Sequence, residues 1–257
     1  MRSPLQNRVD PFGEIHAVPT RGTLMGNRGG CLHDHRRQLS RRRWSSRHWI
    51  ACVLAFHGRH RTVMPPGRYT ELFFLDEATA LAAGHRPCFA CRWREARAFA
   101  TAWACAFDLI QLPRADAMDV RLHAERLVST RTSVFSSRVH PAELPHGAMV
   151  TFPTDESDRS AWLVLDGKLW HWSFAGYSLA MPVAAVQEAE LITAPAIVAT
   201  LAAGYRPHIH ASARDGGMEH PLHAPSLPPA PWHDQAARSP HGPVTHDEDG
   251  DWDAGVP

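Results

Sequence analysis

Residues 72–92 read LFFLDEATALAAGHRPCFACR, and this stretch determines the local fold more firmly than any other part of the chain. The apolar and aromatic run over residues 69–75 predicts a buried strand. Asp76 follows it and is placed to N-cap a helix through Ala83. Gly84 then ends that helix, because glycine adopts the left-handed conformation with least strain. A strand followed by a short helix is therefore expected here.

Cys88 and Cys91 come directly after this helix, on a turn that Pro87 keeps from becoming helical. A second helix is expected to run to about Phe107, since apolar side chains recur there at three- and four-residue spacing. Two cysteines separated by two residues can point both sulfurs at one ion, and the helix N-terminus favours their thiolate forms. A redox pair of the thioredoxin kind should instead follow a strand in a βαβ pattern. The pair is therefore predicted to hold a structural zinc ion.

The stretch from Leu72 to Arg92 resembles the second half of the metal-binding module of the Ada DNA-repair family. In that family a strand, a short Ala-rich helix, an AAG-aromatic-RPC-x-x-C turn and a further helix follow one another in this order. The resemblance covers some twenty of the 257 residues. It implies a zinc ion with four cysteine ligands, one of which, outside this C-x-x-C pair, accepts methyl groups from DNA phosphotriesters.

The chain departs from the family at the first ligand pair. The family has a C-x-x-x-C shortly after a strand, whereas residues 56–61 read FHGRHR. Three completions stay open: Cys31 with Cys52, Cys31 with His33 or His35, and His57 with His60. The preferred set of zinc ligands is Cys88, Cys91, Cys31 and Cys52. Because the methyl-accepting cysteine is not matched, self-alkylating repair is not expected.

The N-terminal part of the chain is strongly basic. Residues 1–70 hold thirteen arginines and three acidic residues, although the whole chain has a formal charge of +1. Residues 36–49 interleave six arginines with two tryptophans, a composition suited to phosphate contacts and base stacking. The alternative is a solvated arm, or arginines paired with the acidic tail. The predicted contacts to DNA or RNA come from Arg41, Arg42, Arg43, Trp44, Arg47 and Arg92.

A cluster of Cys31, His33, Asp34 and His35 supports a different reading of function. These side chains could hold a catalytic metal or transfer protons, which would make the protein a metal-dependent hydrolase or nuclease. No nucleophile stands at a recognisable spacing, so catalytic residues are unknown and the sequence leaves open whether the protein is an enzyme. A third alternative is a zinc-stabilised module for protein interactions.

The fold class expected is α+β, with a small zinc-stabilised α/β module followed by a small antiparallel β-rich domain and a closing helix. The expected boundaries are 1–112 for the Arg-rich, Ada-like module and 113–206 for the β-rich domain. A disordered tail, acidic and rich in proline and histidine, is expected over 207–257.

The clearest signal in the β-rich domain is a hairpin over residues 161–172, whose strands flank Asp166 and Gly167 in a type I′ turn. Further elements are expected as a helix at 119–127, strands at 148–152 and 188–193, and the closing helix at 195–203.

Composition limits where the protein acts. No apolar run approaches the length of a membrane span, and the N-terminal residues lack the apolar core of a secretion signal. The five cysteines are an odd number and too few for a disulfide framework. A cytoplasmic protein without membrane contact is the expectation.

Overall fold

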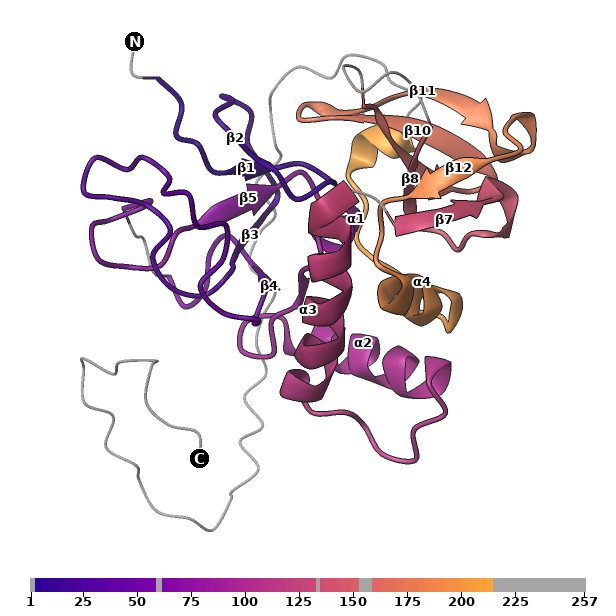
Figure 1. Cartoon of the computed structure of the whole chain (residues 1–257), viewed down its shortest axis with the longest axis horizontal. Coiled ribbons are helices and arrows are strands. Elements are labelled where there is room, and N and C mark those ends of the chain that lie inside the picture. Colours follow the sequence, from indigo (N-terminus) through magenta and orange to yellow (C-terminus); the bar gives the residue numbers. More distant parts are fainter. Residues whose placement is uncertain (1–2, 59–61, 133–134, 153–158, 215–257) are drawn as a thin grey trace. The chain divides into compact units, whose positions relative to one another are not determined.

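The computed structural model describes residues 3–214, apart from 59–61, 133–134 and 153–158. All of these belong to one compact unit, Met1–Glu219, and the second unit, His220–Pro257, lies outside the described residues. The described part contains two six-stranded sheets and four α-helices, so the predicted α+β class is confirmed (Figure 1).

The first sheet is built from very short strands in the order β2-β1-β5-β3-β4-β6. Pairs β1–β5 and β4–β6 are parallel, and the other neighbours are antiparallel. Gly26 lies in β3 because a Cβ there would approach the backbone oxygen of Ile50 to 2.3 Å. The strands are β1 (Arg8–Val9), β2 (Ile15–His16), β3 (Leu24–Asn27), β4 (Ile50–Cys52), β5 (Leu72–Phe74) and β6 (Arg86–Pro87).

The predicted strand–helix unit is present at the centre of the molecule. Helix α1 (Glu77–Ala82) follows β5, and the Asp76 side chain caps it by accepting the Thr79 N–H at 2.9 Å. Gly84 takes φ +82°, so it ends the helix as expected. Every residue of α1 is buried, because both sheets pack around it. The indole of Trp172, from the second sheet, donates to the Thr79 hydroxyl at 3.0 Å.

Two longer helices follow the cysteine pair. Helix α2 (Trp93–Ala106) matches the predicted amphipathic helix. Helix α3 (Ala115–Thr132) is longer than the predicted 119–127. Its first turns carry Met118 and Asp119, both fully buried, so tertiary contacts extend the helix beyond its local apolar pattern.

The second sheet is antiparallel throughout, in the order β11-β10-β9-β8-β12-β7. Asp166 and Gly167 have φ 50° and 71°, which confirms the predicted hairpin turn. Helix α4 (Pro195–Ala202) is the expected closing helix. Strands β7 and β11 were not predicted, because polar and small residues in them interrupt the alternation of apolar and polar side chains that is typical of a strand. The strands are β7 (Phe135–Val139), β8 (Met149–Thr151), β9 (Ala161–Leu165), β10 (Lys168–Ser173), β11 (Gly176–Pro182) and β12 (Ala189–Leu191).

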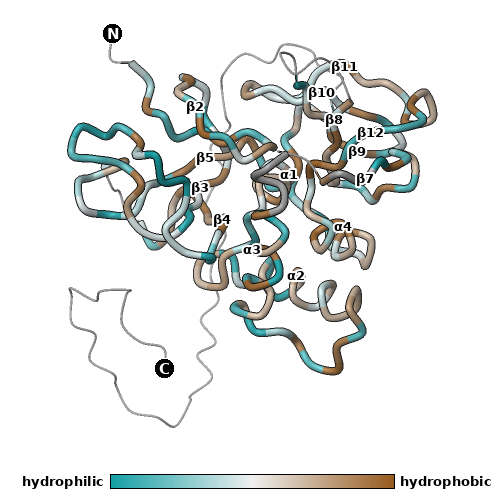
Figure 2. Tube along the Cα trace, viewed as in Figure 1, coloured by the Kyte–Doolittle hydropathy of each residue, from teal (hydrophilic) through white to brown (hydrophobic). Residues whose placement is uncertain are grey.

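One large apolar cluster spans the boundary predicted near residue 112. It brings Leu81 of α1 and Phe99 of α2 together with Leu169 of β10 and Leu201 of α4. A second cluster lies beneath β9–β11, and a smaller third cluster, around Val9 and Phe74, supports the first sheet. The hydropathy colouring in Figure 2 follows this division, with hydrophilic loops beside the first sheet and apolar positions along β9 and α4.

Residues 207–214 differ from the predicted disordered tail. The His208 N–H donates to Glu77 at 2.9 Å, and the His210 N–H donates to Asp76 at 3.0 Å. A short 3-10 helix, Ala211–Ala213, follows. Two buried carboxylates need these donors, which explains why the segment is ordered. The rest of the predicted tail lies outside the described residues.

A search of the described helices found none with the length and apolar character needed to cross a bilayer.

Candidate metal centre

Strand pairing brings the first two cysteines together. The parallel pair β4–β6 sets Ile50 opposite Arg86 and Ala51 opposite Pro87. One residue further along, Cys52 therefore lies beside Cys88. The Cys88 N–H donates to the Ala51 carbonyl at 3.0 Å, which continues the ladder to the cysteines.

The turn after Cys88 returns the chain to bring in the third thiol. The Arg92 N–H donates to the Cys88 carbonyl at 2.9 Å, and Arg92 is the N-cap of α2. The Sγ atoms of Cys52, Cys88 and Cys91 all lie within 4.8 Å of one another. Around a tetrahedral zinc ion with Zn–S bonds of about 2.3 Å, sulfurs are about 3.8 Å apart. The spacing of the three thiols is therefore compatible with one tetrahedral ion.

The three thiols shift one another's pKa values. The pKa of Cys88 is lowered by hydrogen bonds from the Cys52 and Cys91 thiols, helped by the backbone N–H groups of Cys91 and Ala90. The pKa of Cys52 is raised, because its thiol donates to Cys88 and Cys91 and is also buried. A divalent cation bound by the three sulfurs would displace their protons.

Of the residues predicted to complete the site that the structure describes, only Cys52 joins Cys88 and Cys91. The Cys31 thiol donates to the His33 carbonyl at 3.1 Å and is not part of the three-thiol group. His57 stands on a turn with φ 52°, its ring against Phe56, and is outside the group as well. His60 lies outside the described residues. Three of the four predicted zinc ligands are therefore together.

The loop around His33 has a structural arrangement. His33 is buried; its Nε2–H donates to the Pro65 carbonyl at 3.1 Å, and its Nδ1 shares a 2.6 Å hydrogen bond with the Thr70 hydroxyl. Asp34 accepts the N–H groups of Arg36 and Gln38, and the latter contact leads the lowering of its pKa. Both ring nitrogens of His33 are used in these hydrogen bonds, so His33 and Asp34 stabilise the loop. Among the described residues, no metal-binding group includes them.

The Arg-rich segment lies on the surface. Arg41, Arg42, Arg43 and Arg47 are exposed, and among the described residues none of them forms an ion pair with a carboxylate. Trp44 is half-buried, with its ring 6.2 Å from that of Trp49. Arg43 donates to the Ser40 carbonyl at 2.9 Å, and the Trp44 ring also lies 6.1 Å from that of His123.

Arg92 is not part of that surface, so the prediction that it contacts nucleic acid is wrong. Its side chain is 3% exposed and forms an ion pair of 2.9 Å with Glu77. Glu77 is fully buried and also accepts from the Tyr205 hydroxyl at 2.6 Å. Arg92 supplies the positive charge that balances this buried carboxylate.

A second buried ion pair next to the cysteines was missed by sequence reasoning. Arg86 donates to both carboxylate oxygens of Asp119, at 2.9 and 2.6 Å, and His48 contacts the same carboxylate at 2.8 Å. The ligand atoms of His48, Asp116 and Asp119 also lie within 4.8 Å of one another, but the bidentate arginine occupies Asp119. No local signal links residues this far apart. Arg86 and Arg92 therefore anchor the cysteine turn on both sides, to α3 and to α1.

Comparison of the chain with protein-family models, with characterised proteins and with solved structures finds no match. The resemblance to the Ada family therefore stays a prediction from the residues that carry it.

Proposed function

We propose that the protein binds a zinc ion through Cys52, Cys88 and Cys91 and uses it to stabilise a nucleic-acid-binding surface. The observation that carries the metal proposal is the convergence of three thiols within 4.8 Å. Sulfur ligands favour zinc over the hard cations magnesium and calcium, which prefer oxygen. The ion would join the end of β4 to the start of α2.

The surroundings of the cysteines support a preformed structural site. Cys52 and Cys88 are buried, and ion pairs on both sides hold the turn that carries Cys88 and Cys91. Such a frame orients the ligands before the ion arrives, which lowers the cost of binding it. The role proposed for the ion is structural, because Cys-rich ligand sets are typical of structural zinc sites and two of the three thiols are buried.

The nucleic-acid part of the proposal rests on the connection between the basic segment and the metal centre. Residues 36–47 lead directly into β4, which ends at Cys52. Trp49 anchors this connection, since the guanidinium groups of Arg28 and Arg126 lie 4.0 and 4.5 Å from its ring. Fixing β4 with zinc would therefore hold the base of an exposed, cationic loop that can contact phosphates.

Metal analysis of the purified protein tests the first step. We expect about one zinc per chain, lost in Cys88→Ser and kept in the control Cys105→Ser, because Cys105 is exposed and outside the group. Cobalt substitution should give thiolate-to-metal charge-transfer bands that weaken in Cys52→Ser. Zinc content well below one per chain, or a Cys88→Ser variant that retains the metal, would contradict the proposal.

Binding to labelled single- and double-stranded DNA over a range of salt concentrations tests the second step. If six arginines contact phosphates, log K should fall with log salt at a slope of about −5. The triple variant Arg41→Gln, Arg42→Gln, Arg43→Gln should reduce that slope by about half. Arg138→Gln, an exposed arginine of β7, is the control. Equal binding by the triple variant and the native protein would remove the nucleic-acid role and leave the metal site standing.

A further inference from the structure

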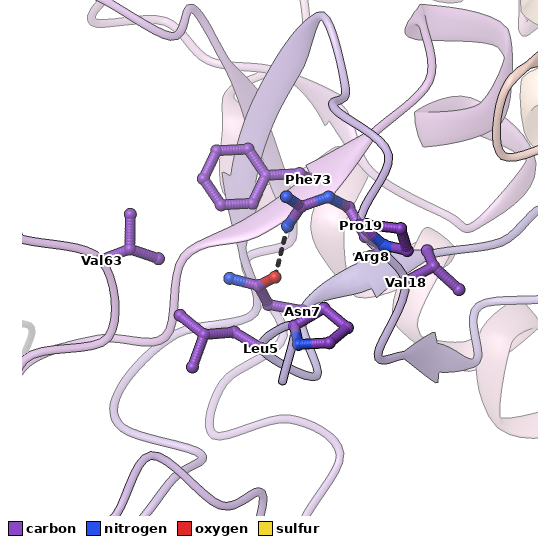
Figure 3. Close-up of a pocket in the computed structure, with 8 residues that line it drawn as sticks. Leu5, Asn7, Arg8, Val18, Pro19, Val63 and Phe73 are labelled. Atoms are coloured by element: carbon purple, nitrogen blue, oxygen red, sulfur yellow. Dashed lines mark hydrogen bonds between the residues drawn. The ribbon is translucent and has the colours of Figure 1, made fainter. Parts of the chain in front are cut away.

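A cavity of about 330 Å³ lies beside the neighbouring strands β1 and β5 of the first sheet, and no cysteine lines it (Figure 3). The N-terminal segment entering β1 forms one wall, and Val18 and Pro19, after β2, form another. Val63 and the ring of Phe73, from β5, complete it. Most of the lining is apolar, and its polar side chains are Asn7 and Arg8. The cavity has the size of a site for a small organic molecule.

Asn7 carries the first sign of a ligand. It is 1% exposed, its Oδ1 accepts a hydrogen bond from Arg8, and its Nδ2 has no hydrogen-bond partner among the residues that the structure describes. Rotating the amide by half a turn would set its NH₂ group against the guanidinium, so the contact with Arg8 defines which atom is the nitrogen. In Figure 3 this nitrogen points into the space between Leu5, Val63 and Phe73. An acceptor in the cavity would satisfy this buried donor.

Arg8 is the second sign. Its Nε donates to the Thr20 carbonyl at 2.6 Å, and its guanidinium lies 4.7 Å from the centre of the Phe73 ring. Among the described residues no carboxylate forms an ion pair with it. Burial, followed by the nearby charge of Arg21, lowers its pKa, which reflects a positive charge without compensation. An anion in the cavity would supply that compensation.

We propose that this cavity binds a small organic carboxylate with an apolar body. One carboxylate oxygen would accept from Asn7 Nδ2, and its charge would balance Arg8. The apolar body would cover Leu5, Val18 and Val63. The site offers hydrogen-bond donors and a cation, so it selects against cationic ligands, and its apolar walls disfavour a compact, strongly hydrated anion such as phosphate.

Benzoate is the probe, and the methyl resonances of Leu5, Val18 and Val63 in the full-length protein as purified are the readout. We expect saturable shifts confined to these methyl groups. Benzamide and benzylammonium, which share the ring and lack the negative charge, should bind at least about tenfold more weakly. Inorganic phosphate should leave the three resonances unchanged.

Asn7→Asp is the decisive variant. It keeps the acceptor for Arg8 but replaces the free donor with a carboxylate oxygen, so benzoate affinity should fall by about tenfold or more. Asn27→Asp is the matched control, since Asn27 only accepts the Gly29 N–H and lies outside the cavity. Val63→Phe, which fills the cavity without touching its polar groups, should also abolish binding.

Three results would overturn the proposal: no shift at saturating benzoate, equal affinity for benzamide, or unchanged affinity in Asn7→Asp. In each case Asn7 would be a hydrated amide and the cavity a surface hollow. Zinc content and DNA binding do not enter these measurements, so failure here is separate from failure of the proposed function.

Discussion

The part of the described chain up to Arg126 and the part after it bury different kinds of side chain. Before that point the buried residues include eleven that can carry charge. After it, the buried polar residues are three threonines, Thr151, Thr193 and Thr200. The charged set is Asp10, Arg28, His33, Glu71, Asp76, Glu77, His85, Arg86, Arg92, Asp119 and Arg126.

The difference follows from the size of the strands. The first sheet has strands of two to four residues, which present few apolar side chains, whereas strands of the second sheet reach seven residues. Ion pairs, caps and the thiol cluster therefore take the place of apolar packing around the first sheet. A buried ion pair adds little net stability, but the loss of one partner is costly. The first region should thus be the more sensitive to single polar substitutions.

The largest effect is expected for Asp119→Asn. This change leaves Arg86 buried without its carboxylate, so the free energy of unfolding should fall by about 3–5 kcal/mol. Zinc retention should also weaken, because Arg86 holds the strand that leads to Cys88. Urea unfolding and metal analysis measure both. Asp116→Asn is the control: this carboxylate is 56% exposed and lies 3.6 Å from His48, so a change below about 0.5 kcal/mol is expected. Equal losses of unfolding free energy in the two variants would show that the buried ion pair is no more important for stability than the exposed contact.

A smaller effect is expected for Leu163→Ala in β9. Leu163 is fully buried in the apolar cluster below the second sheet, and its truncation should cost about 3 kcal/mol through lost burial and a residual cavity. Zinc content should not change, in contrast to Asp119→Asn. Leu179→Ala, at a position 74% exposed, should unfold like the native protein. Loss of zinc in Leu163→Ala would mean that the two regions are not energetically distinct.

The smallest effect concerns pH. Burial, followed by the charges of Arg28 and Arg126, holds the pKa of His85 well below its ordinary value. In the unfolded chain His85 therefore binds a proton below about pH 6.5, whereas in the folded protein it stays neutral. Its contribution to the free energy of unfolding is fully present above that pH and decreases as the pH falls below it. His85→Gln can still accept from Arg28 and should lose this part of the pH dependence in urea titrations.

The pKa of His16 is shifted in the opposite direction, so its contribution to stability has the opposite pH dependence. Its pKa is raised, chiefly by the hydrogen bond to Asp10. Its contribution is present below pH 6.5 and is lost as the pH rises through the folded pKa. His16→Gln should therefore change the pH profile in the direction opposite to His85→Gln. Profiles that move in the same direction would contradict the assigned environments.

Elements encoded by neighbouring residues could be predicted from the sequence. The Asp76 cap, the Gly84 helix end and the Asp166-Gly167 turn each depend on side chains and dihedral angles within a few positions. Helix α2 and the α+β class follow from periodicity alone. Strands β7 and β11 could not be predicted in this way, because their pairing partners, rather than their own pattern, stabilise them.

For the candidate metal centre, the sequence by itself determined the pair Cys88 and Cys91, since a C-x-x-C on a turn before a helix is a local feature. The tertiary structure decided the rest. Parallel pairing of β4 with β6 brings in Cys52 and leaves Cys31 at the His33 loop, and the buried carboxylate of Glu77 draws Arg92 away from the surface. Strand register and the burial of charge depend on residues distant in sequence, so neither can be predicted from local residue spacing.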